Sequence, residues 1–243
     1  MKEQVTGDSD ITVEISDIRD DMRRYRTDVV VREAEVTIKV GGRVCTRLFC
    51  LPSDFEELAT GYLRSEGFDT SYVSKIEVEA VGPEIFEILV ALEKKVWRKP
   101  CKVVSGLKIK REEVFRYAKE LDECGLIFKK TGGTHVVACF DLNFNRKRDG
   151  LFVEDVSRHC AIDKLIGICS KNGTKITGSV LVTSCRQSRS TMKKAISAGF
   201  PVVISVSAPT HLAIRDAAEF GVTLVGFARD NRFNVYTHEW RIL

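Results

Sequence analysis

The sequence predicts an α/β protein with a three-layer domain on a mixed, mostly parallel sheet, preceded by a smaller β-rich domain. Two observations predict this. From about residue 135 onward, short apolar strand-like runs alternate with segments of helical periodicity, and this alternation is typical of a mostly parallel sheet covered by helices on both faces. Before residue 110, period-two alternation dominates instead. We therefore expect a smaller domain over residues 1–109 and an α/β domain over residues 110–243.

The smaller domain is expected to contain strands, one helix and a linker. Alternating apolar and polar residues around Gly41-Gly42 indicate a β-hairpin, because glycine readily adopts the positive φ of the turn. Ser53 and Glu56 form a capping box, which starts a helix. A basic, irregular stretch then indicates a mobile loop. In chain order, the hairpin, the helix, two strands and the loop are expected at residues 28–50, 53–67, 74–80, 84–92 and 93–108.

The α/β domain is expected to begin with a helix from about Arg111 to Glu123 that stops at Gly125. An antiparallel pair of strands follows, near residues 135–141 and 151–154. The remaining helices are expected at residues 159–171, 188–198 and 210–220. The remaining strands are expected at residues 178–183, 201–206, 222–226 and 233–237.

Composition excludes several classes of function. The 243 residues have ordinary globular proportions, with 44% hydrophobic and 30% charged residues. The net charge of +4 is too small and too dispersed to indicate a nucleic-acid partner. No apolar signal region opens the chain, and no run approaches the roughly 18 apolar residues of a membrane helix. We therefore expect a cytoplasmic protein that has no membrane partner.

The eight cysteines do not indicate a metal site, because no two of them form a C-x-x-C pair. Cys139 and Cys169 lie inside apolar runs and are expected to be core residues. Cys101 and Cys185 lie in polar sequence, and their roles stay open.

Polar residues follow the predicted strands of the α/β domain. Carboxyl ends of parallel strands share one edge of a sheet, where helix N-termini also converge. The turn at 131–135 precedes its strand, but antiparallel pairing would bring it to the same edge. Arginine, hydroxyl and free N–H groups suit phosphate, although serine and threonine can also simply cap helices. The segments that indicate a phosphate-bearing ligand are 131–135, 155–159, 184–188, 207–210 and 227–232.

Two enzymatic alternatives lack their motifs. A zinc deaminase needs H-x-E followed by P-C-x-x-C, but Val136 and Val137 follow His135, and Arg186-Gln187 follow Cys185. A serine nucleophile of the G-x-S-x-G type is absent as well. The sequence thus excludes both deamination and that kind of acyl transfer.

Five segments in sequence order resemble the FdhD/NarQ family of formate dehydrogenase accessory sulfurtransferases. They are LPSDFEELATGYLRSEG (51–67), TGGTHVVA (131–138), EDVSRHCAIDK (154–164), SVSAPTHLA (205–213) and GFARDNRFNVYT (226–237). The resemblance implies an α/β domain with the cytidine deaminase fold, without its zinc site. It also implies sulfur transfer from a cysteine desulfurase to a guanine-dinucleotide molybdenum or tungsten cofactor, which is then inserted into formate dehydrogenase.

The resemblance and the residue chemistry together predict a cofactor site. Gly132 and Gly133 allow backbone N–H groups to approach a phosphate, while Arg186 and Arg229 offer guanidinium forks. The Asp230 carboxylate suits the guanine N1–H and 2-amino groups. The residues expected to bind molybdopterin guanine dinucleotide as cargo are Thr131, Gly132, Gly133, His135, Arg158, His159, Arg186, Thr210, Phe227, Ala228, Arg229, Asp230, Asn231 and Arg232.

One departure from the family pattern leaves the activity open. The family normally forms a persulfide in a C-x-x-C motif before the helix at 111–123, and here only Cys101 lies in that region. A single thiolate can carry sulfur, but a second thiol would assist its transfer. Three hypotheses follow: a sulfurtransferase-type carrier that uses Cys101, a non-catalytic cofactor chaperone, and a guanine-nucleotide-binding protein without a role in formate metabolism. A homodimer is compatible with each.

Overall fold

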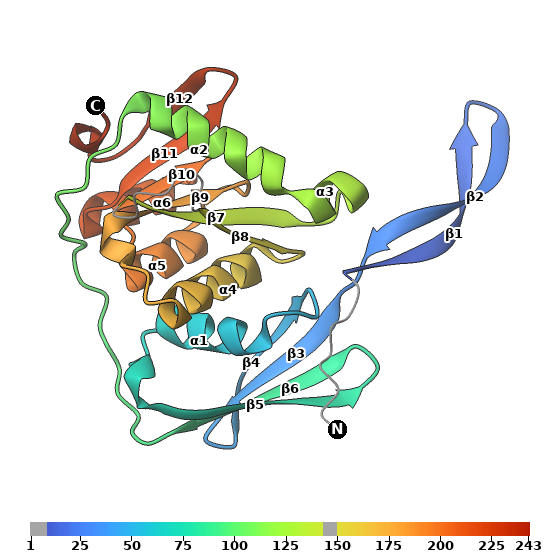
Figure 1. Cartoon of the computed structure of the whole chain (residues 1–243), viewed down its shortest axis with the longest axis horizontal. Helices are drawn as coiled ribbons and strands as arrows, with labels where there is room; N and C mark the ends of the chain where they lie inside the picture. The colour runs from blue at the N-terminus through green and yellow to red at the C-terminus, as the bar shows by residue number, and fades with distance from the viewer. Residues whose placement is uncertain (1–8, 143–149) are drawn as a thin grey trace.

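The computed structural model describes residues 9–142 and 150–243, whose strands form three sheets (Figure 1). A two-stranded ribbon extends from the body of the molecule, and a four-stranded and a six-stranded sheet lie within that body. No helix of the described residues is long and apolar enough to cross a membrane. The predicted division of the chain between residues 109 and 110 stays a prediction, as does the cytoplasmic location.

The four-stranded sheet has the order β4-β3-β6-β5, in which β3 and β6 are parallel and the other pairs are antiparallel. It confirms the predicted hairpin for residues 34–50, with Gly41 and Gly42 at positive φ in the turn. Residues 28–31 belong instead to the preceding ribbon. The strands are β3 (Ala34–Val40), β4 (Arg43–Cys50), β5 (Val73–Gly82) and β6 (Ile85–Leu92).

The helix α1 (Phe55–Ser65) lies between this sheet and the helix α4 (Arg158–Lys171) (Figure 1). The two helices approach each other through glycines. A Cβ atom on Gly61 would lie 1.7 Å from the Asp163 carbonyl oxygen, and one on Gly167 would lie 2.0 Å from that of Glu57. Because any side chain would force the helices apart, these glycines fix α1 directly on α4.

The six-stranded sheet has the order β12-β11-β10-β9-β7-β8 and is mixed, as predicted. It is less parallel than predicted, since two of its five strand pairs are parallel and three are antiparallel. Strands β8, β9, β10 and β11 run in one direction, while β7 and β12 run in the other. Apolar residues of α4, α5 and α6 pack on one face and those of α2 on the other, so the domain has three layers. The strands are β7 (His135–Asp141), β8 (Gly150–Asp155), β9 (Ser179–Thr183), β10 (Val202–Ser205), β11 (Thr223–Arg229) and β12 (Arg232–Val235). The other helices are α2 (Arg111–Cys124), α5 (Arg189–Ala198) and α6 (His211–Phe220).

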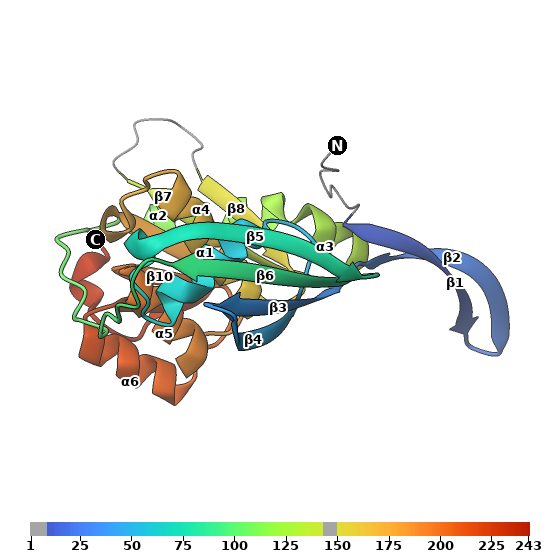
Figure 2. The same cartoon turned by 90° about the horizontal axis from the view of Figure 1, so that it is seen from below.

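Four features differ from the sequence prediction. The N-cap of α1 is Asp54, with no side-chain cap, so the predicted capping box of Ser53 and Glu56 is not formed. The strands β1 (Asp10–Arg19) and β2 (Met22–Val31) form the ribbon that extends from the body (Figure 2). A short helix, α3 (Leu126–Thr131), follows Gly125. The segment 227–232, predicted as a loop, contains the end of β11 and the start of β12.

The segment 93–108 contains no helix or extended strand, in agreement with the predicted loop. It runs along one end of the molecule from the four-stranded sheet to α2 (Figure 1). The mobility predicted for it stays a prediction.

Candidate functional site

The predicted strand-end segments converge on one edge of the six-stranded sheet. His135, at the start of β7, is paired with Asp155 at the end of β8, and Val137 is paired with Thr183 at the end of β9. The turn before β7 therefore lies beside the carboxyl ends of β8 and β9. This confirms the antiparallel arrangement that the sequence predicted.

A cavity of about 1080 Å³ opens at this edge between α2, the turn before β7 and the hairpin of β11 and β12. Its volume is that of a small-molecule site. The predicted site residues in its wall are Gly132, Gly133, His135, Ala228, Arg229, Asp230 and Asn231. Thr134 and Ser184, from the predicted segments 131–135 and 184–188, also line it. Further lining residues that the sequence analysis did not identify include Phe115, Arg116, Lys119 and Phe128.

A tight turn brings Arg229 and Asp230 to the cavity. Asp230 and Asn231 have φ values of 53° and 58°, and two consecutive residues at positive φ form the two-residue hairpin turn that suits twisted strands. The Arg229 Nε and Asp230 Oδ2 atoms are 4.0 Å apart, and both side chains are exposed. Such a weak, solvated pair leaves both groups available to a ligand. Phe227 and Arg232 lie outside this cavity wall.

Basic side chains gather beside the cavity. Burial lowers the pKa of His135, and so do Arg158 and Arg186. Burial also lowers the pKa of His159 to about 4, with further contributions from Arg158, Lys194 and His135. Within the described residues, neither Arg158 nor Arg186 forms an ion pair, and the buried Arg158 Nε has no hydrogen-bond partner. Uncompensated positive charge of this kind favours an anionic ligand.

Two other predicted residues, Thr131 and Thr210, form hydrogen bonds that stabilise the backbone around the site. The Thr131 hydroxyl donates to the Ile127 carbonyl at 2.8 Å and accepts from Gly133 N at 3.2 Å. Thr210 caps α6 by accepting from Ala213 N at 3.4 Å, which is the alternative role considered for such hydroxyls. These two residues therefore shape the edge rather than form the cavity wall.

Glu154 is a site-shaping residue that the sequence analysis did not identify. Its two carboxylate oxygens accept from Ile127 N at 2.9 Å, Phe128 N at 2.8 Å and the Thr134 hydroxyl at 2.8 Å. A carboxylate is favourable at a helix N-terminus, where backbone N–H groups are free. Glu154 thus caps α3 from the neighbouring β8 strand and holds both ends of the turn before β7.

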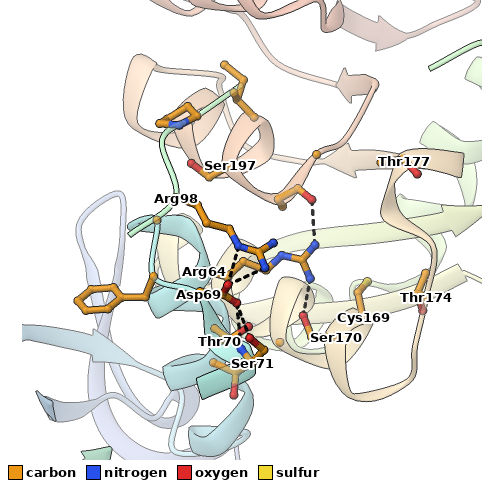
Figure 3. A pocket seen from close by; sticks show the side chains of 18 of the residues that line it. Arg64, Asp69, Thr70, Ser71, Arg98, Cys169, Ser170, Thr174, Thr177 and Ser197 are labelled. Atoms are coloured by element: carbon orange, nitrogen blue, oxygen red, sulfur yellow. Dashed lines mark hydrogen bonds and ion pairs between the residues drawn. The ribbon is translucent and has the colours of Figure 1, made fainter. Parts of the chain in front are cut away.

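Cys101 is exposed and lies at the opposite edge of the sheet. It lines a second cavity, of about 930 Å³, together with residues that precede β9 and β10, such as Thr177 and Gly199. Figure 3 shows this cavity. Cys139 and Cys169 are buried, as predicted, and Cys185 is also buried. The described residues contain no group of three or more His, Cys, Asp or Glu side chains placed to hold a metal ion.

Comparisons with known proteins identify similar chains. A family model described as the FdhD/NarQ family matches residues 86–243. A protein of Methanothermobacter thermautotrophicus named sulfur carrier protein FdhD is 32% identical, and the match covers 92% of this chain and 95% of the relative. A Bacillus subtilis protein of the same name is 33% identical, over 88% of this chain and 90% of its own.

The fold also matches a solved structure. The crystal structure of a candidate formate dehydrogenase accessory protein from Desulfotalea psychrophila superposes with a TM-score of 0.82 and 24% identity. The match covers 97% of this chain and 100% of that one. It shows that the two chains share the same fold.

Proposed function

The chain belongs to the FdhD/NarQ family, and from this premise we propose that it is a sulfur-carrying accessory protein required for formate dehydrogenase activity. In this proposal the cargo is a molybdopterin guanine dinucleotide cofactor with molybdenum or tungsten. A cysteine desulfurase supplies the sulfur, and formate dehydrogenase receives the cofactor. The cytidine deaminase-like fold implied by the resemblance belongs to the same proposal.

The cofactor assignment rests on one observation: the 1080 Å³ cavity adjoins the basic side chains Arg158 and Arg186. His135 lines the cavity, and burial and then both arginines lower its pKa. A guanine dinucleotide has a planar base and a pyrophosphate. The base suits the cavity, where Asp230 can accept from guanine N–H groups and the aromatic rings of Phe115 and Phe128 can contact its faces. The pyrophosphate suits the Arg158 and Arg186 guanidinium groups at the adjoining edge.

The sulfur-carrying residue in this proposal is Cys101. Its thiolate attacks the outer sulfur of the desulfurase persulfide, so that a persulfide forms on Cys101 and the desulfurase thiolate leaves. Exposure of Cys101 allows a second protein to reach it. Because the cofactor cavity lies at the other edge of the sheet, delivery requires movement of segment 93–108 or a cavity on a second copy of the chain. The homodimer remains part of the proposal for this reason.

A chaperone without sulfur transfer is the second candidate, because segment 93–108 contains no second cysteine to form a C-x-x-C pair with Cys101. Cys169 lines the same cavity but is buried. Genetic complementation distinguishes the two. In a host that lacks its own family member, the wild-type chain should restore formate dehydrogenase activity, while Cys101→Ser and Arg229→Ala should not. The exposed Cys45→Ser variant is the matched control and should restore activity.

A mass measurement then locates the defect. After incubation with a cysteine desulfurase and cysteine, the Cys101 peptide should gain the mass of one sulfur atom. Full complementation by Cys101→Ser, with no sulfur on Cys101 in the wild type, would leave the chaperone function. Failure of the wild type to complement would contradict both functions.

A further inference from the structure

The cavity beside Cys101 has a cationic wall. Five basic residues line it, namely Arg64, Arg98, Lys99, Lys102 and Lys171, together with three carboxylates, those of Glu56, Glu57 and Asp69. Two of these carboxylates already have partners, since Glu57 binds Lys171 at 2.6 Å and Asp69 binds Arg98 at 2.7 Å. In the described part of the chain, Arg64, Lys99 and Lys102 form no ion pair. The wall therefore has an excess of positive charge.

Arg64 is the central group of this wall. It projects from α1, its Nη1 donates to the Ser170 hydroxyl at 2.9 Å, and its Nη2 donates to the Ala198 carbonyl at 3.2 Å. These neutral acceptors hold the guanidinium in place without balancing its charge. Burial lowers the pKa of Arg64, the nearby Cys169 raises it, and the neighbouring Arg98 lowers it. Arg98 is already paired with Asp69, so Arg64 is the guanidinium without a counter-ion. A half-buried guanidinium in that state is electrostatically unfavourable, and an anionic ligand would balance its charge.

Arg98 is fixed next to Arg64 by the chain itself. Its Nε and Nη2 donate to Asp69 Oδ2 at 2.9 and 2.7 Å, and Asp69 also accepts from the Ser71 backbone and hydroxyl groups. Figure 3 shows the two guanidinium groups together at the centre of the cavity, with Ser170 and Ser197 from two other helices around them. The buried Ser197 hydroxyl has no hydrogen-bond partner among the described residues. The Ser170 hydroxyl already donates to the Ile166 carbonyl at 2.9 Å. The Ser197 hydroxyl and the remaining guanidinium N–H groups of Arg64 and Arg98 are therefore the donors that suit the oxygens of an oxyanion.

We propose that this cavity binds a small molecule bearing an oxyanion group, such as a sulfate, phosphate or carboxylate, which Arg64 and Arg98 hold beside Cys101. The volume of about 930 Å³ leaves room for a larger molecule that carries the oxyanion. The site is independent of the proposed cofactor cavity, which lies at the other edge of the sheet.

Alkylation of Cys101 in the intact protein tests this site. Iodoacetate and iodoacetamide have similar size and chemistry, but only iodoacetate is an anion. Their reaction rates with Cys101, measured by peptide mass spectrometry, should favour iodoacetate. Sodium sulfate should suppress the iodoacetate reaction much more than sodium chloride at equal ionic strength, with little effect on iodoacetamide. Phosphate and acetate, tested in the same way, identify which oxyanion the site prefers.

Substitution tests the role of Arg64. Arg64→Gln should lower the iodoacetate-to-iodoacetamide rate ratio roughly fivefold, as expected for losing one nearby charge. Arg215→Gln, an exposed arginine on α6, is the matched control and should leave the ratio unchanged. Should Arg64→Gln fail to fold, the sulfate competition on the wild type still decides the matter. Equal suppression by chloride and sulfate, or an unchanged ratio in a folded Arg64→Gln variant, would overturn the proposal.

Discussion

Lys164 Nζ lies 2.6 Å from Asp155 Oδ2, and neither side chain is exposed to solvent. Asp155 ends β8 and also accepts from Leu51 N at 3.2 Å and Ser157 N at 2.8 Å, so it joins three segments. Lys164 donates in addition to the Leu51 carbonyl at 3.0 Å. Because Ser157 caps α4, this buried pair sets where Arg158 and His159 begin that helix at the candidate site.

Removing one member of this pair should strongly destabilise the fold. Asp155→Ala leaves the Lys164 ammonium buried without a counter-ion, and we expect a loss of about 3–5 kcal/mol in the free energy of unfolding. Chemical denaturation measures it. The double variant Asp155→Asn with Lys164→Met removes both charges and should recover part of that loss. A double variant that is no more stable than Asp155→Ala would show that the buried charge is not the cause.

The glycine contact between α1 and α4 predicts a second stability effect. Gly61→Ala places a methyl group 1.7 Å from the Asp163 carbonyl oxygen, so the helices must separate. Overpacking of this kind costs about 1–3 kcal/mol or more. Gly106→Ala has no atom within 4 Å of the new Cβ and serves as the control. Equal melting temperatures for the two variants would contradict the close packing of the helices.

The low pKa of His159 predicts a pH effect on stability. The folded state holds the pKa of His159 at about 4, below its ordinary value near 6.5, because of burial and then of Arg158, Lys194 and His135. Above pH 6.5 the imidazole is neutral in both states, so the full stability is present. As the pH falls from 6.5 towards 4, the unfolded chain takes up a proton that the folded chain does not, and stability decreases.

Thermal denaturation between pH 7 and pH 4 checks this expectation. His159→Gln should show a smaller loss of stability over that range than the wild type. His211→Gln, an exposed histidine on α6, should behave like the wild type. Identical pH profiles for His159→Gln and the wild type would show that His159 does not contribute.

Because Glu154 caps α3 beside the cavity, we expect its substitution to affect ligand affinity more than the stability of the core. Glu154→Gln removes the negative charge that accepts from Ile127 N and Phe128 N, at a cost of about 1–2 kcal/mol to the end of α3. The turn at Gly132 and Gly133 follows α3, so ligand affinity should fall. Hydrogen exchange of the 126–134 backbone, compared with Glu123→Gln on the exposed surface of α2, measures the loosening. Unchanged protection of this segment in Glu154→Gln would contradict the capping role.

The order of helices and strands and the sheet topology were predictable because they follow from the pattern of apolar residues. The α/β order, the antiparallel start at His135 and the common edge all follow from periodicity and sheet geometry. The ribbon of β1 and β2 was not predicted, because its strands are dense in charged residues and face solvent on both sides. The short helix α3 was not predicted because its N-terminal cap, Glu154, is far from it in the sequence, although β8 lies beside it in the fold.

The site was predictable at its strand ends but not on its opposite wall. Arg229 and Asp230 follow an apolar strand and so were identified from sequence order. The opposite wall includes Phe115, Arg116 and Lys119 of α2. Helical periodicity predicts which face of α2 is buried, but it does not predict which of the other residues line a cavity. The cavity at Arg64 was not predictable either, since it joins α1, the linker, α4 and α5, which are far apart in the sequence.

Titration calorimetry with GDP and ADP tests the central claim most directly. The wild-type chain should bind GDP more tightly than ADP, because Asp230 can accept from the guanine N1–H and 2-amino groups, which adenine lacks. Arg229→Ala should weaken GDP binding roughly tenfold to a hundredfold, as expected for the loss of one charged hydrogen bond. Arg47→Ala, an exposed arginine on β4, should bind as the wild type does. Equal affinity for GDP and ADP, or unchanged affinity in Arg229→Ala, would contradict a guanine-nucleotide site at this edge of the sheet.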